Sequence, residues 1–344
     1  MGLRVGSVGY ATSQGIGHLT KSFYDAGVIT DIMVYQHPHG EQRAPTHMEW
    51  YPVGTHKITT KAIYGEKVER FLDDVDVMLF VETPFDWAFA NRCHERGVKT
   101  VIIPMYEWFL QKPHHKFDLF INPSLLDQEY FPQGIHIPIP VEDHVTWTLR
   151  NTAKHFLHNA GHVGSRNHKG TLELMRAMEF VTSPIELTIR CQDTAGMGRL
   201  LEAAPICKTD KRISIVDHEI PRDKLFDPYF DVYIAPEKYN GLSLPLQEAF
   251  ASGMCVMTSN RFPHNQWLPE EPLIPVSGTR RISVGSGYNM IDESIVDPHD
   301  IAATIDKWYG ASLTNLSLKG EFYKRCNSWT NLKPRYIEAL ENLV

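Results

Sequence analysis

The sequence predicts an α/β protein made of two doubly wound, Rossmann-like domains. Three observations lead to this fold class: short β-rich runs alternate with helical stretches, the alternation restarts after residue 150, and a proline-rich segment separates the two halves. A chain of 344 residues is long enough for two domains of roughly 150 residues each. We therefore expect two hydrophobic cores.

In the first half of the chain, apolar strand-like runs are separated by helical stretches. The predicted strands cover 3–10, 29–36, 75–82 and 98–105, and the predicted helices cover 18–27 and 87–97. Strands that alternate with helices are typical of a parallel sheet covered on both faces. This half is predicted to form the N-terminal domain, residues 1–140.

The same alternation continues in the second half. The predicted strands cover 154–161, 185–192, 212–219, 231–237 and 254–260, and the predicted helices lie near 169–180, 244–252 and 299–309. We therefore predict a second Rossmann-like domain, residues 141–328.

The domain boundary is predicted within 131–144, where Pro132, Pro138 and Pro140 break any helix and favour an extended connection. The chain ends in a predicted amphipathic helix that is entered at Pro334. Its apolar positions at helical spacing are Tyr336, Ile337, Ala339, Leu340 and Leu343. We expect this C-terminal helix, 329–344, to complete the N-terminal domain.

Composition and charge limit the class of partner. The formal net charge is −7 and the isoelectric point is near 6.2, which disfavours binding of nucleic acid by general attraction to phosphate. The five cysteines form no Cys-x-x-Cys pair, so the sequence indicates neither a zinc site nor a redox dithiol and favours a reducing cytosol. Without an apolar run of about eighteen residues or a charged-then-apolar leader, we expect a cytoplasmic protein with no transmembrane segment.

The first candidate site is the glycine turn within 10–23, where a predicted strand runs into a helix. Gly15 and Gly17 would let backbone amides approach a ligand closely, at a helix start that favours negative charge. A plain βα turn without a ligand explains the same pattern equally well. The turn lacks a third glycine, and no acidic residue clearly ends the following strand, which disfavours a dinucleotide-binding dehydrogenase.

The second candidate site is the turn after strand 154–161, in which Gly161 and Gly164 precede Arg166 and Lys169. Cations placed just before a helix oppose the helix dipole unless an anion lies among them. A phosphate group would fit this arrangement, and a solvated basic loop is the alternative.

The third candidate site is the loop and helix within 237–253. The loop 240–243 would present consecutive amides, and Pro245 and Gly253 suit the two ends of a helix. Glu248 falls on or near the apolar face of that helix. A buried carboxylate needs partners, and ligand hydroxyls would serve. The alternative is a partly exposed glutamate at the edge of the sheet.

This third segment resembles the donor-binding element of retaining GT-B glycosyltransferases, which usually contains Glu-Gly-Phe-Gly-Leu-Pro, two further residues and Glu-Ala. The matching residues are Gly241, Leu244, Pro245, Glu248, Ala249 and Gly253. Asn240 stands in place of the first glutamate, Leu242 in place of the phenylalanine and Ser243 in place of the second glycine.

The turn with Arg166, Lys169 and Gly170 is similar to the phosphate-binding element of the same family, although the gap from arginine to lysine is short. His162 competes for the place of the arginine. With the N-terminal glycine turn and the terminal helix, the resemblance spans most of the chain, and its specific motifs lie in the C-terminal half.

The resemblance implies a GT-B fold with two domains facing a cleft. It implies transfer of a hexose from a UDP- or GDP-linked donor, with UDP favoured, to an acceptor hydroxyl, with retention and without a metal ion. Glu248 would accept hydrogen bonds from the ribose hydroxyls. The amides of 241–243, with Arg166 and Lys169, would hold the diphosphate, and Asn240 would face the donor sugar. Gly15 and Gly17 are also assigned to donor binding.

The N-terminal domain is expected to bind the acceptor. Glu82 and Glu107 follow predicted strands, at the edge where open α/β sheets bind ligands. Either carboxylate could orient the acceptor or act as a base, and together with Asn240 they form the predicted catalytic group. As the alternative, Glu82 or Asp86 caps the following helix. No Asp-x-Asp motif occurs, and the histidine pair at 114–115 has no third ligand at a metal-binding spacing, so no metal site is predicted.

Two further interpretations stay open. The acceptor can be a glycan, lipid or small molecule, which the acidic charge favours, or a hydroxymethylated pyrimidine in DNA, as for phage-type glycosyltransferases. The chain can also be a non-catalytic nucleotide-sugar binding protein, because Asn240 lacks the charge of the first glutamate. The residues do not decide between retention and inversion.

Overall fold

The computed structural model describes residues 2–36, 45–59, 62–82, 86–109, 117–161, 167–218, 220–284 and 289–344. The chain divides into two compact units, which we describe separately. Unit 1 comprises Met1–Pro140, Val284–Asn289 and Trp329–Val344, and unit 2 comprises Val141–Ser283 and Met290–Ser328. The sequence predicts domains of 1–140 with 329–344, and of 141–328, and the ligand assigned to each domain stays a prediction.

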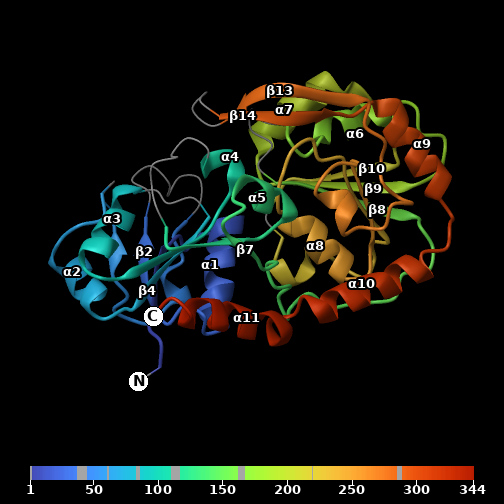
Figure 1. Cartoon of the computed structure of the whole chain (residues 1–344). Coiled ribbons are helices and arrows are strands. Elements are labelled where there is room, and N and C mark those ends of the chain that lie inside the picture. The colour runs from blue at the N-terminus through green and yellow to red at the C-terminus, as the bar shows by residue number, and fades with distance from the viewer. Residues whose placement is uncertain are drawn as a thin grey trace. The chain divides into compact units, whose positions relative to one another are not determined.

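Unit 1 contains a seven-stranded parallel sheet with the strand order β3-β2-β1-β4-β5-β6-β7 (Figure 1). Its strands are β1 (Val5–Gly9), β2 (Asp31–Tyr35), β3 (Lys57–Ile58), β4 (Val77–Val81), β5 (Lys99–Ile103), β6 (Leu119–Asn122) and β7 (Ile135–His136). Its helices are α1 (Gly15–Asp25), η1 (Met48–Trp50), α2 (Glu66–Asp73), α3 (Ala88–Glu95), α4 (Tyr106–Phe109), α5 (Leu125–Tyr130) and α11 (Trp329–Glu341).

The C-terminal helix α11 packs in unit 1 beside α1 (Figure 1). The rings of Trp329 and Tyr336 both meet the fully buried ring of Phe23 edge-on at 5.0 Å. The indole of Trp329 donates to the Ser22 hydroxyl at 2.9 Å. These contacts explain why the helix begins at Trp329, so the prediction that Pro334 starts it was wrong and the proline lies inside the helix.

Unit 2 contains a five-stranded parallel sheet with the strand order β10-β9-β8-β11-β12 (Figure 1). Its strands are β8 (His155–Gly161), β9 (Glu186–Cys191), β10 (Ile213–Val216), β11 (Val232–Ala235) and β12 (Cys255–Thr258). Its helices are α6 (Thr171–Ala177), α7 (Thr194–Ala203), η2 (Pro205–Lys208), η3 (Arg222–Lys224), α8 (Leu244–Ala251), η4 (His264–Gln266), α9 (Pro298–Trp308) and α10 (Thr314–Cys326). A separate two-stranded sheet pairs β13 (Gly278–Val284) with β14 (Asn289–Ile295).

The predicted fold class is confirmed: each unit holds a parallel sheet in an order typical of doubly wound α/β domains. Each predicted strand and each predicted helix overlaps an observed one. The strand order reverses between β1 and β4 in unit 1, and between β8 and β11 in unit 2. In open α/β sheets, ligands bind beyond the carboxyl ends of the strands at such a reversal. The turns that follow these four strands are therefore the places to look for a site.

Candidate functional site

In unit 2, the structure brings the second and third candidate segments together. The turn with Lys169 follows β8, and the loop before α8 follows β11. The backbone N–H of Lys238 donates to the carbonyl oxygen of His168 at 2.7 Å. A Cβ added to Gly170, whose φ is +68°, would lie 2.2 Å from the carbonyl oxygen of Pro236. Only glycine allows this approach, so Gly170 fixes the turn against the end of β11.

Lys169 lies within the electrostatic influence of Glu237, a residue that was not selected from the sequence. Burial raises the pKa of the Glu237 carboxyl, and the charge of Lys169 and a hydrogen bond from Ser243 oppose that shift. Burial lowers the pKa of Lys169, and the charge of Glu237 opposes this shift in turn. The Lys169 ammonium also donates to the carbonyl oxygen of Asn159 at 3.3 Å. A cation is thus fixed at the carboxyl end of β8.

Asn240 caps its own loop. Its side-chain oxygen accepts hydrogen bonds from the backbone N–H groups of Leu242 and Ser243, each at 3.1 Å. Two of the three amides assigned to the diphosphate are therefore occupied in this structure. The roles predicted for Asn240, Gly241, Leu242 and Ser243 stay predictions, and they require this side chain to release the two amides.

Ser243 takes a conformation that normally favours glycine. Its φ is 46° and its ψ is 74°, in the left-handed region, at the position where the resembling family has a glycine. Its hydroxyl donates to Glu237 Oε1 at 2.7 Å, and Glu237 is fully buried. This hydrogen bond joins the strained residue to the carboxyl group whose charge acts on Lys169.

Gln247 on α8 holds the loop from the other side. Its side-chain N–H donates to the carbonyl oxygen of Leu242 at 2.9 Å, and its side-chain oxygen accepts from the Tyr323 hydroxyl at 3.2 Å. The loop conformation is therefore fixed by side chains from α8 and α10 as well as by Asn240.

Glu248 is buried, with 7% of its surface exposed, and it has a charged partner. Its Oε1 accepts a hydrogen bond from Arg222 at 2.7 Å, and the same guanidinium nitrogen donates to Glu142 Oε1 at 2.6 Å. Burial raises the pKa of Glu248, and the positive charge of Arg222 opposes that shift. Arg222, on η3, was not selected from the sequence because nothing local links it to α8.

In unit 1, the two glycines of the first candidate differ. A Cβ on Gly17 would lie 2.1 Å from the carbonyl oxygen of Thr12, so the turn itself requires a glycine there. A Cβ on Gly15 would meet no atom within 4 Å. The plain-turn interpretation therefore accounts for Gly17, while Gly15 leaves the start of α1 open to a ligand.

Three carboxyl groups follow neighbouring strands of unit 1. Glu82 follows β4, Glu107 lies on α4 after β5, and Asp127 lies on α5 after β6. Burial, and secondly the charge of Glu107, raises the pKa of Glu82 to about 8. Burial raises the pKa of Asp127 to about 7 against a hydrogen bond from Ser124, and the charge of Glu107 adds to the shift. Asp127 was missed because it sits in a short helix with no motif.

Asp86 bonds to the start of α3, although Trp87 occupies the N-cap position and no side chain caps this helix. Its carboxylate accepts from the backbone N–H of Ala88 at 3.1 Å and from that of Ile63 at 2.8 Å. Glu82 instead has a left-handed backbone, with φ at 59°. A non-glycine residue in this region is strained by about 1–3 kcal/mol, and such strain often occurs at functional sites.

Arg166, Gly164, His162 and the histidine pair at 114–115 lie outside the described residues. Within the described ranges, no group of three or more His, Cys, Asp or Glu side chains is arranged to hold a metal ion. A search of the same ranges for membrane-spanning helices finds none that is long and apolar enough.

No family model and no curated protein matches the sequence. Solved structures do match over almost the whole chain. A glycosyltransferase from Rickettsia africae ESF-5 matches with a TM-score of 0.70 and a sequence identity of 11%. The match covers 99% of this chain and 98% of the Rickettsia chain. HepE from Anabaena, in complex with UDP and glucose, matches with a TM-score of 0.70 and a sequence identity of 10%. The match covers 99% of this chain and 100% of the HepE chain. The chain has the GT-B fold.

A third match extends this result. Sucrose-phosphate synthase from Thermosynechococcus elongatus has a TM-score of 0.66 at 13% identity, with 99% of both chains covered. At such identities the likeness establishes the GT-B fold and leaves the activity to be argued from the site.

Proposed function

We propose that this protein is a glycosyltransferase that moves a hexose from a nucleotide-sugar, with UDP-sugars favoured over GDP-sugars, to an acceptor hydroxyl. The observation that supports the proposal is the hydrogen bond from Lys238 to His168, which joins the Lys169 turn to the segment that leads through the loop 240–243 into α8 and its buried Glu248. HepE, which has the same fold, binds UDP and glucose. A cation, a buried carboxylate and loop amides suit the diphosphate and the ribose of such a donor.

The chemistry follows from the charge that develops in the reaction. When the bond between the sugar and the diphosphate breaks, negative charge grows on the departing phosphate oxygens. Lys169 is positioned by its hydrogen bond to the Asn159 carbonyl and interacts electrostatically with Glu237, so little reorganisation is needed to stabilise that charge. In this proposal the diphosphate takes the amides that Asn240 now caps, and Asn240 turns to the sugar hydroxyls. Lys169 and Arg166 supply the positive charge, so no metal ion is required.

The acceptor side of the proposal rests on unit 1. With its pKa near 8, Glu82 is mostly protonated at pH 7 and donates a hydrogen bond to an acceptor oxygen, whereas Glu107 carries the negative charge. The neutral acid of Glu82 can orient a hydroxyl group by donating to its oxygen, and the Glu107 carboxylate can receive the proton of that hydroxyl group. Retention of the sugar's configuration belongs to the proposal through the resemblance of the donor loop to retaining enzymes.

The experiment combines binding with turnover. Calorimetry measures the affinity for UDP and GDP, and mass spectrometry follows hydrolysis or transfer from UDP-glucose and GDP-mannose with glycan, small-molecule and hydroxymethylated DNA acceptors. Glu248→Ala should abolish both binding and turnover, whereas Glu202→Ala, an exposed position on α7, should change neither. If the protein binds UDP but turns over no donor with any acceptor, it is a nucleotide-sugar binding protein, which the capping by Asn240 would then explain.

A further inference from the structure

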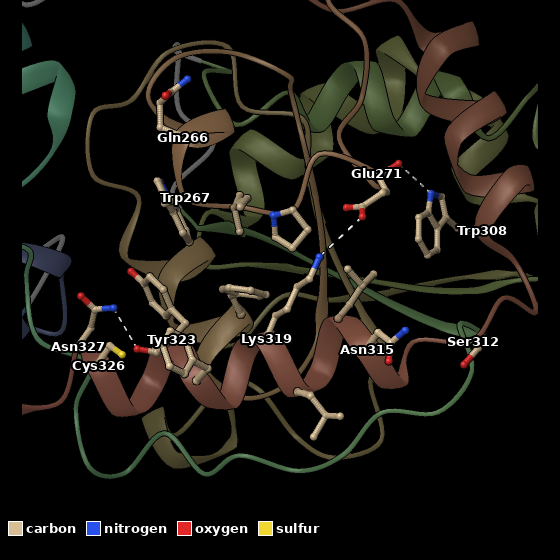
Figure 2. Close-up of a pocket in the computed structure, with 16 residues that line it drawn as sticks. Gln266, Trp267, Glu271, Trp308, Ser312, Asn315, Lys319, Tyr323, Cys326 and Asn327 are labelled. Carbon is tan, nitrogen blue, oxygen red and sulfur yellow. Dashed lines mark hydrogen bonds and ion pairs between the residues drawn. The ribbon is translucent and has the colours of Figure 1, made fainter.

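A second concave surface of unit 2 contains none of the residues assigned to the donor, although it includes Tyr323, whose hydroxyl supports the donor loop through Gln247. It is a groove of about 900 Å³ between α10, the end of α9 and the segment after η4 (Figure 2). Of α8, only Phe250, near the helix end remote from the donor loop, reaches it. Pockets of roughly 300–1,000 Å³ hold drug-sized ligands, so the groove has room for more than one sugar ring.

Aromatic rings form one part of this groove. Trp267 stacks on Tyr323 with ring centroids 5.2 Å apart and an interplanar angle of 27° (Figure 2). Phe322 is 59% exposed and Leu318, one turn earlier on α10, is 47% exposed. These two side chains, one turn apart, give this face of α10 an exposed apolar surface at the groove. Such rings offer flat faces to the C–H groups of a sugar ring.

Polar side chains lie among the apolar ones that line the groove, and its two charged residues form a pair. Lys319 on α10 lies opposite Glu271, with 3.7 Å between the ammonium nitrogen and Oε1 (Figure 2). Both side chains are more than half exposed, at 54% and 59%. Asn315 and Asn327 add amide groups at the two ends of α10. Paired charges and neutral amides suit a ligand with many hydroxyl groups and no net charge.

The same pattern disfavours other ligands. An anionic ligand would face the Glu271 carboxylate and would have to compete for Lys319. A buried acyl chain would meet the amides and the ion pair without satisfying them. A sugar chain matches both parts, because its rings have apolar C–H faces and a rim of hydroxyl groups.

We propose that this groove binds a neutral oligosaccharide, with sugar rings lying against Trp267 and Phe322 and hydroxyl groups meeting Asn315, Lys319 and Glu271. The choice of a sugar chain rests on the proposed glycosyltransferase function, since a sugar-transferring enzyme acts where such chains are present. The groove holds the distal part of a glycan and takes no part in the transfer itself.

Cys326 provides the assay. It lines the groove and is exposed, whereas Cys93, Cys191, Cys207 and Cys255 are buried, so a thiol reagent should modify Cys326 first. The rate of its reaction with 5,5′-dithiobis(2-nitrobenzoate) is measured on the intact protein with millimolar hexasaccharides of glucan, chitin, mannan and galactan type. If a bound chain shields the thiol, the rate should fall about tenfold at ten times the dissociation constant. At least one neutral hexasaccharide should protect in a saturable way.

Two variants of the same kind separate the groove from general effects. Phe322→Ala should abolish protection and leave the affinity for UDP unchanged. Phe180→Ala, at a ring that is 41% exposed and lies outside the groove, should change neither quantity. A melting temperature equal to that of the unmodified protein confirms that each variant is folded.

Three results would overturn the proposal. The first is that no hexasaccharide protects the thiol, and the second is that anionic lipid vesicles or sulfated oligosaccharides protect it better than neutral hexasaccharides. The third is that the labelling rate decreases as the protein concentration is raised without any ligand, which would indicate a second copy of the chain in the groove. Calorimetry with UDP is run on the same samples. If UDP binds but no hexasaccharide protects Cys326, only the groove proposal is refuted. If a hexasaccharide protects Cys326 but UDP does not bind, only the proposed donor site is refuted.

Discussion

The ion pair between Arg222 and Glu248 gives a quantitative test of the donor site in unit 2. The change is Arg222→Met, which keeps a long side chain and removes the guanidinium. The Glu248 carboxylate, whose side chain is 9% exposed, then has no guanidinium to neutralise its charge. Glu142 loses the same ion-pair partner.

The magnitude follows from burial. Removing one partner of a buried ion pair costs about 3–5 kcal/mol, because the other charge stays desolvated. The Arg222 side chain is 21% exposed, so some water reaches the pair, and we expect about 3 kcal/mol for Arg222→Met. Glu248→Gln should cost only about 1 kcal/mol, because the guanidinium keeps Glu142 at 2.6 Å. The double variant should be more stable than Arg222→Met alone.

The assay is unfolding in guanidinium chloride, followed by tryptophan fluorescence, for both single variants and the double variant. Arg281→Met is the matched control, because Arg281 and Asp292 form an ion pair in which both side chains are more than half exposed. Its cost should stay below about 0.5 kcal/mol. A cost for Arg222→Met as small as that of the control, or no recovery in the double variant, would refute the account of Glu248.

The destabilisation caused by Arg222→Met should change with pH, in a direction set by the pKa of Glu248. Without Arg222, burial raises the pKa of Glu248 with little to oppose it. A raised pKa means that the folded state binds the proton more tightly than the unfolded state, whose carboxyl has a pKa of about 4.3. Stability from this group is then present below that value and is lost as the pH rises through the folded pKa. Arg222→Met should therefore be more destabilising at pH 8 than at pH 5.

Four other changes test the remaining assignments. Lys169→Met should weaken UDP binding by about 1–3 kcal/mol in calorimetry, as for a lost charge-assisted hydrogen bond, and unchanged affinity would remove Lys169 from the diphosphate site. Gln247→Leu should weaken UDP binding by about 1 kcal/mol through the loosened loop, and equal affinity would show that the loop holds without it. Because the pKa of Glu82 is raised to about 8, its contribution to stability is lost as the pH rises from about 4.3 through 8. Glu82→Gln should therefore flatten the dependence of the unfolding free energy on pH between about pH 6 and 9. An unchanged pH dependence would contradict the raised pKa. Asn240→Asp should weaken UDP binding by about 2 kcal/mol, because the aspartate would compete with the diphosphate for the loop amides. Tighter binding would contradict this competition.

The sequence predicts well what local patterns determine. The apolar run of β4 is buried at every position, and its strand was predicted from that run alone. The two-residue strand β3 was missed, because its pairing with β2 is imposed by the neighbouring strand and not by two residues of sequence. Helix α2 was also missed, although Val68 and Leu72, one turn apart, are its buried face.

The same division holds at the candidate site. The burial of Glu248 could be predicted, because its helix has apolar neighbours at helical spacing. Its partner Arg222 lies 26 residues earlier, on a short 3-10 turn, and only the folded chain brings the two together. Glu237 was overlooked although it begins the segment 237–253, since a carboxyl group at a strand end gives no sign in the sequence that it will be buried and bonded to Ser243 of its own loop.

Asn240 shows why a departure from a family pattern need not remove the function of the loop. A neutral amide oxygen makes hydrogen bonds worth about 0.5–1.5 kcal/mol each, whereas a charged oxygen makes bonds worth about 1.5–3 kcal/mol. The two amides that Asn240 caps at 3.1 Å are therefore kept in place with no donor bound, and a diphosphate oxygen can still displace the side chain. An aspartate at this position would compete with the diphosphate for the same amides and repel its charge. The neutral residue thus keeps the loop ordered and leaves it able to accept an anion.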